Sequence, residues 1–155
     1  MIAIQFEVGG QRYAIDVADI VEVVPAVELR VVRGVAEGVV GVLRYHGNIV
    51  PVLDLSQLLA GTAAPRWLST RLIILRLDRG NGAVQLLGVL AERATLGMTE
   101  EIDVEADVRP LGVASSTAPF LSAMTVYGEP SITFLTTASL LSEAQYRNVV
   151  GAASD

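Results

Sequence analysis

The hydrophobic and polar positions of the chain follow the two-residue period of β-strands far more often than the helical period. In residues 2–8 large apolar side chains occupy every second position, which is typical of a strand with one buried face. Gly9 and Gly10 follow and predict a tight hairpin turn. Further runs rich in Val, Ile and Thr, the residues that favour strands, cover residues 12–15, 20–25, 39–45, 48–55, 72–78, 84–92, 120–127 and 131–135.

Two helical stretches, near residues 55–60 and 137–149, follow strands in the same way. The segments IVPVLDLSQLL, ending at Leu59, and SITFLTTASLL, ending at Leu141, each contain a strand, a polar residue and a leucine pair. Asp54 and Thr136 hold matching places, and both are predicted as helix N-caps. The pattern therefore predicts an all-β chain made of two copies of a small unit, with only short helices.

Composition narrows the classes of function. The 155 residues are 52% hydrophobic and only 18% charged, and the formal net charge of −6 argues against binding to nucleic acid. The chain has no cysteine, which excludes disulfides and thiolate metal sites, and a single histidine argues against a histidine-based metal centre. Such an apolar, weakly charged chain suggests that partners cover part of its surface.

No segment predicts insertion into a membrane. The longest uncharged stretch, residues 110–128, contains proline and glycine, which do not suit a spanning helix. The start of the chain, MIAIQFEVGG, lacks the basic residues and the cleavage site of a signal peptide. We therefore expect a cytoplasmic protein.

The chain lacks the usual frames of catalytic chemistry. Its serines do not lie on a nucleophile elbow, and Gly34, Gly38 and Gly41 do not have the spacing of a phosphate-binding loop. Asp54 could be catalytic at the end of a strand, but capping a helix accounts for it better. We therefore expect no enzyme, no cofactor and no metal site.

Three further features have two interpretations each. His46, between Tyr45 and Gly47, is either a turn residue or an exposed contact residue. Trp67 is either a core aromatic or a surface anchor for a partner, with the core favoured. The acidic run over residues 100–107 is expected to be a solvated face, although it could steer a basic partner.

Three segments resemble the CheW family, the adaptors of bacterial chemosensory arrays. They are RYAIDVADIVEVV at residues 12–24, GVLRYHGNIVPVLDL at 41–55 and LLGVLAE at 86–92. The most specific part is the match of Pro51, Asp54 and Leu55 to the family's P-V-x-D-L segment. Tyr45 and the stretch at residues 68–75 also resemble adaptors of Wsp-type arrays, which control a second-messenger cyclase.

The resemblance implies two packed SH3-like five-stranded β-barrels within a single domain over residues 1–150. We expect the first barrel at about 12–65 and the second at about 66–136, with the N-terminal strand and the C-terminal helix packed alongside. Residues 151–155 are expected to be a tail.

The resemblance also implies a non-catalytic adaptor, monomeric alone and part of a larger array. It would couple the cytoplasmic tips of chemoreceptors to the regulatory domain of a CheA-type histidine kinase. Other interpretations are a regulatory domain of such a kinase, a small ligand-binding β-barrel or, least favoured, a small hydrolase that uses Asp54 or His46.

The family's receptor contact runs along a groove between the barrels. The matching positions in this chain are Ile20, Glu22, Gly41, Tyr45, His46 and Gly47. Where the family has Asn-Leu-Arg-Gly, this chain has Arg44-Tyr45-His46-Gly47, so the groove arginine is a histidine and cannot offer a bidentate fork. Gly41 is expected to leave room for close approach of the receptor.

Overall fold

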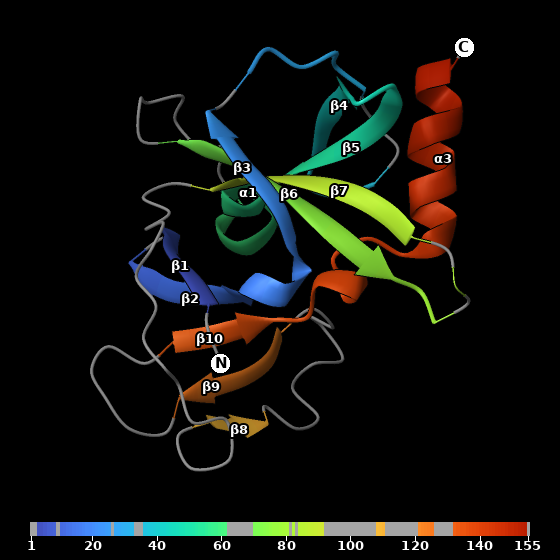
Figure 1. The fold of residues 1–155 in the computed structure, drawn as a ribbon. Coiled ribbons are helices and arrows are strands. Elements are labelled where there is room, and N and C mark those ends of the chain that lie inside the picture. The colour runs from blue at the N-terminus through green and yellow to red at the C-terminus, as the bar shows by residue number, and fades with distance from the viewer. Residues whose placement is uncertain are drawn as a thin grey trace.

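The computed structural model describes residues 3–8, 10–25, 27–32, 36–61, 70–80, 82, 84–91, 108–110, 121–125 and 132–154. The strands in this part of the chain form two five-stranded sheets (Figure 1). We call them the terminal sheet, which combines strands from both ends of the chain, and the central sheet, which holds the strands between them. The predicted all-β class is therefore confirmed.

The terminal sheet has the strand order β1-β2-β10-β9-β8. Its parallel pair, β2 with β10, joins the two ends of the chain, and its other neighbours are antiparallel. The strands are β1 (Ala3–Val8), β2 (Gln11–Asp16), β8 (Val108–Pro110), β9 (Leu121–Thr125) and β10 (Ile132–Leu135).

The central sheet has the order β3-β6-β7-β5-β4, so β3 and β4 are its two end strands. Its parallel pair is β5 with β7. The strands are β3 (Ile20–Pro25), β4 (Val39–Tyr45), β5 (Asn48–Asp54), β6 (Arg71–Asp78) and β7 (Val84–Ala91).

The predicted boundary between the two halves, near residue 65, was wrong, because it does not separate the strands of one sheet from those of the other. β6 and β7 follow that boundary, yet they pair with β3 and β5 of the central sheet. β2 precedes it, within the range expected for the first barrel, yet it pairs with β10 in the terminal sheet. Non-local strand pairing, and not position along the chain, decides which sheet a strand joins.

The predicted internal repeat is confirmed in the pairing of the strands. β5 lies between an antiparallel hairpin partner, β4, and a parallel strand, β7. β10 likewise lies between the antiparallel β9 and the parallel β2. Each copy then enters a short helical turn, which is α1 (Leu55–Ala60) after β5 and the 3-10 turn η3 (Thr137–Ser139) after β10.

The caps of these helical turns differ from one copy to the other. Asp54 caps α1 as predicted, whereas Thr136 makes no side-chain capping bond to η3. Ser142, six residues after Thr136, instead caps the start of the next helix. Its hydroxyl accepts from Gln145 N at 3.1 Å while Gln145 Oε1 accepts from Ser142 N at 3.0 Å, a reciprocal capping box.

That box starts the C-terminal helix α3 (Glu143–Ser154) later than the predicted range of 137–149. The expected tail at 151–155 is also corrected, because residues 151–154 continue the helix. Gln145, three residues after Ser142, was the sequence signal for this start.

Much of the apolar excess is buried between and within the sheets. Along β6, Ile73, Leu75 and Leu77 face the main core that both sheets share, whereas Leu72 and Ile74 face a second cluster on the other side of the central sheet. All five side chains are fully buried. A strand buried on both faces needs a continuous apolar run, so a large part of the apolar composition reflects this internal packing.

Three side chains form long-range hydrogen bonds that hold α3 and the residues just before it in place. In Figure 1 the helix stands beside the central sheet. The Arg79 guanidinium donates to the carbonyl oxygens of Ala138 and Leu141 just before the helix, at 2.7 and 2.6 Å. The Tyr146 hydroxyl donates to Leu86 O at 2.8 Å, and Arg30 Nη1 donates to Ala153 O at 2.8 Å. Arg30 thus places a positive charge at the negative end of the helix.

Candidate functional site

The two end strands of the central sheet carry most of the predicted receptor-contact residues. Each strand contains a β-bulge, because its register shifts at Val21 in β3 and at Val40 in β4. A bulge bends its strand and increases the local twist. Bulges in both end strands favour a sheet that curls, so that its two ends approach one another.

A side-chain hydrogen bond joins these two ends. The Tyr45 hydroxyl on β4 donates to Glu22 Oε2 on β3. This bond to the carboxylate is the main cause that raises the pKa of Tyr45 above its ordinary value. Val24 of β3 and Leu43 and Tyr45 of β4 also pack against the same apolar cluster on the inner face of the curl.

His46 lies beside this pair at the tip of the β4–β5 hairpin. Its φ is 48° and that of Gly47 is 82°, the positive values that both central residues of a type I′ turn require. The His46 ring stands edge-on to the Tyr45 ring, with the centroids 4.3 Å apart. Both interpretations of His46 therefore find support, because it is a turn residue and it is exposed next to the predicted contact residues.

Ile20 and Gly41 lie apart from this exposed group. Ile20 packs against the main core between the sheets. Gly41 is buried, and a Cβ added there would overlap the carbonyl oxygen of Arg30. Next to Gly41, Arg30 N donates to Val42 O at 3.0 Å and Val42 N donates to Arg30 O at 2.8 Å. A segment of this chain therefore occupies the space at Gly41 that we expected the receptor to approach.

The P-V-x-D-L motif is structural. Asp54 Oδ1 accepts from Ser56 N at 2.9 Å and from Gln57 N at 3.3 Å, so the carboxylate caps α1. Leu55 is fully buried in the main core, and Pro51 is buried opposite Val42. These residues hold the helix against the sheet and leave Asp54 no exposed face for chemistry.

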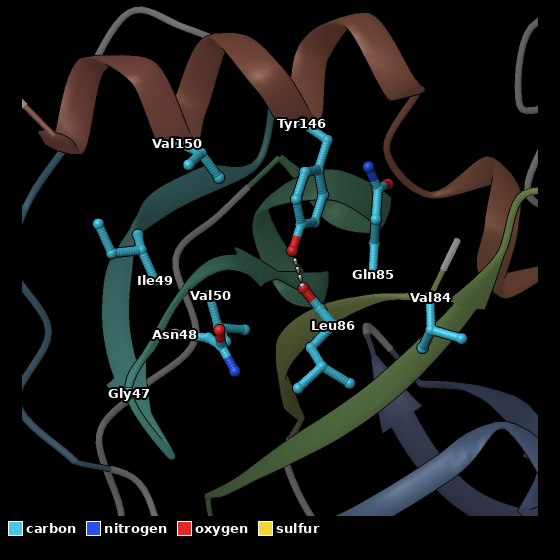
Figure 2. Close-up of a pocket in the computed structure, with 9 residues that line it drawn as sticks. All are labelled: Gly47, Asn48, Ile49, Val50, Val84, Gln85, Leu86, Tyr146 and Val150. Carbon is cyan, nitrogen blue, oxygen red and sulfur yellow. Dashed lines mark hydrogen bonds between the residues drawn. The ribbon is translucent and has the colours of Figure 1, made fainter. Parts of the chain in front are cut away.

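An open hollow of about 580 Å³ lies between α3 and the starts of β5 and β7. Figure 2 shows Tyr146 reaching from the helix to the backbone of Leu86, with Ile49 and Val150 on the neighbouring side. The amide side chains of Asn48 and Gln85 supply polar groups at the lining. Sequence reasoning missed this hollow, because the helix and the two strand starts are far apart along the chain.

Exposed apolar side chains gather in one stretch of the described residues. Of the large hydrophobic residues that are exposed there, Val17, Val21, Val27 and Val31 lie within residues 17–31, and Val84 is the other. Acidic residues such as Glu22 and Glu28 are interspersed among them and exposed. Exposed valines and exposed acidic residues are therefore interspersed along this stretch of the chain.

The described residues hold neither a metal-binding cluster nor a candidate membrane span. No group of three or more His, Asp or Glu side chains there could hold a metal ion. No helix in the described ranges is long and apolar enough to span a bilayer. Trp67 and the acidic run over residues 100–107 lie outside the described residues.

Comparisons with known proteins agree with this architecture. The family of CheW-like domains matches residues 3–145. Among solved structures, the fold is similar to that of the scaffolding protein TtCheW from Thermoanaerobacter tengcongensis, with a TM-score of 0.70 and 20% sequence identity. That match covers 87% of this chain and 88% of the other. No curated protein sequence matches.

Proposed function

The chain belongs to the family of CheW-like domains, and on that premise we propose that it is a non-catalytic adaptor of a chemosensory array. It would couple the cytoplasmic tips of chemoreceptors to the regulatory domain of a CheA-type histidine kinase, in the cytoplasm and without a cofactor. The family match over residues 3–145 carries the proposal. The structural role of Asp54 supports it, because the carboxylate that a hydrolase would use is a helix cap.

We propose further that each sheet is an SH3-like barrel within one domain. The bulges at Val21 and Val40 and the hydrogen bond from Tyr45 to Glu22 support this for the central sheet. The repeat of the pairing around β5 and β10 extends the argument to the terminal sheet.

The proposed receptor-binding surface is the exposed group Glu22, Tyr45, His46 and Gly47, to which the resemblance adds Ile20, although this side chain packs against the main core. Gly41 supports this surface from within by letting residues 30 and 42 pair. For the kinase we propose the exposed valines of residues 17–31, because apolar side chains left in water are typical of a docking face.

A reconstitution experiment tests the proposal. We expect the purified chain to form a three-component complex with a receptor cytoplasmic fragment and a histidine kinase from the same organism, and to raise kinase autophosphorylation. A chain that binds another adaptor but not a receptor would instead be a kinase regulatory domain. Binding to neither protein would contradict the adaptor role and favour a ligand-binding barrel. A response at the level of a cyclase would assign the array to the Wsp type.

His46 can be tested without loss of the turn. We expect His46→Asn to keep the hairpin, since asparagine accepts positive φ readily, and to leave the free energy of unfolding within about 0.5 kcal/mol of the wild-type value. Asparagine lacks the imidazole ring that stands against Tyr45. If the His46 ring contacts the receptor, the variant will bind the receptor fragment more weakly than the wild type.

Two outcomes would separate the interpretations of His46. Equal affinities of the two proteins for the receptor fragment would make His46 a turn residue only. The variant His46→Val serves as the opposite control, because a β-branched residue at positive φ should destabilise the hairpin.

A further inference from the structure

Of the two side chains that make the contact between the end strands of the central sheet, Glu22 matches the family pattern and Tyr45 departs from it. That pattern places leucine where this chain has Tyr45. A leucine at this position could pack against the inner cluster as Tyr45 does, but it has no hydroxyl to donate to Glu22. The hydrogen bond between β4 and β3 therefore depends on the tyrosine at position 45.

Tyr45 is itself held in place on two sides. Its ring packs against the apolar cluster on the inner face of the curled sheet, and the His46 ring stands edge-on against it. Its hydroxyl then reaches the exposed Glu22, whose own strand is bent by the bulge at Val21. One partly buried side chain thus touches both polar groups of the surface.

We propose that Tyr45 is a positioning residue, which ties β4 to Glu22 of β3 and so holds the Glu22 carboxylate and the His46 ring at fixed places on the receptor-binding surface. A surface whose polar groups are already ordered loses less conformational entropy when a partner binds. The effect on affinity rests on the proposed function, whereas the link between the strands does not.

The link has a pH dependence of known sign. The hydrogen bond from Tyr45 to Glu22 raises the pKa of Tyr45. The folded chain therefore keeps the Tyr45 hydroxyl protonated at a pH where the unfolded chain has begun to lose that proton. The contribution of the link is therefore complete below the ordinary value of about 10 and is lost as the pH rises through the raised value. Ionised Tyr45 cannot donate, and it would repel Glu22.

A double-mutant cycle with Tyr45→Phe and Glu22→Gln tests the link. Phenylalanine keeps the ring and its packing, while Gln removes the charge of the acceptor. We expect the single variants to be non-additive, with a coupling of about threefold in the unfolding equilibrium constant at neutral pH. The coupling should fade above pH 10. Tyr13→Phe, which makes the same chemical change in the terminal sheet, is the matched control and should show no coupling to Glu22→Gln.

Affinity for the receptor cytoplasmic fragment tests the positioning role. We expect Tyr45→Phe to weaken binding by about three- to tenfold and Tyr13→Phe to leave it unchanged. Additive stabilities in the cycle would overturn the link itself. Coupled stabilities with unchanged affinity would overturn the positioning role. If the wild-type chain binds no receptor fragment, the proposed function is wrong, and the coupling alone then decides whether Tyr45 and Glu22 are linked.

Discussion

Replacing Gly41 with alanine is expected to lower the free energy of unfolding by about 2 kcal/mol or more. The added Cβ would overlap the carbonyl oxygen of Arg30, which is backbone and cannot rotate away. Relief requires the segment at Arg30 to move, and that movement would break its two hydrogen bonds to Val42. Forcing extra volume into a well-packed site costs about 1–3 kcal/mol, and the lost bonds add to this. Urea unfolding followed by circular dichroism measures the change.

Gly151→Ala is the matched control for this prediction. Gly151 lies within α3, where an added Cβ meets no atom within 4 Å. Alanine favours a helix over glycine by about 1 kcal/mol, so this variant should be more stable than the wild type. A stable Gly41→Ala variant would show that the segment at Arg30 does not lie against β4. A charged residue at Gly41 is a poor probe of receptor contact, because it would disturb the fold first.

The second large effect is expected at Arg79, which connects the β6–β7 end of the central sheet to the segment before α3. Its guanidinium donates to Gln85 Oε1 at 2.8 Å as well as to the carbonyls of Ala138 and Leu141. Arg79→Met keeps the aliphatic stem and removes all three bonds. A hydrogen bond from a charged group contributes about 1.5–3 kcal/mol, and bonds that share one guanidinium are not additive, so we expect a total loss of about 3 kcal/mol.

Amide hydrogen exchange shows which elements the Arg79→Met variant destabilises. Amides of α3 and of residues 137–141 should exchange faster, while those of β6 should keep their protection. Arg76→Met is the control, because Arg76 is exposed on the same strand and a surface substitution should change stability by about 0.5 kcal/mol or less. Equal stability of the two variants would contradict the role given to Arg79.

Local features of the fold were predictable from the sequence, because their causes lie within a few residues. The alternation of apolar positions located the strands, and the carboxylate of Asp54 lies three residues before the amide of Gln57 that it binds. The internal repeat was visible for the same reason, as each copy is a continuous segment. Thr136 makes no capping bond to η3, and the capping box of the next helix lies six and nine positions later, at Ser142 and Gln145.

Features that depend on non-local pairing were not predictable. Nothing near Gly41 in the sequence shows that Arg30 covers it, and nothing near Tyr45 indicates Glu22 as its acceptor. The bulge at Val21 adds to the difficulty. It puts Ile20 and Val23, three residues apart, against the same main core, whereas a regular strand would point them to opposite sides.

The parallel pairing of β2 with β10 has a consequence for how the chain folds. Arg12 lies opposite Ile132, so the terminal sheet joins segments from near the two ends of the chain. Closing so long a loop is entropically costly, and contacts of this separation slow folding. During synthesis the central sheet has all of its strands once β7 has emerged, whereas the hairpin of β1 and β2 must wait for β10. We therefore expect β2 to complete its pairing in the terminal sheet only after β10 has been synthesised.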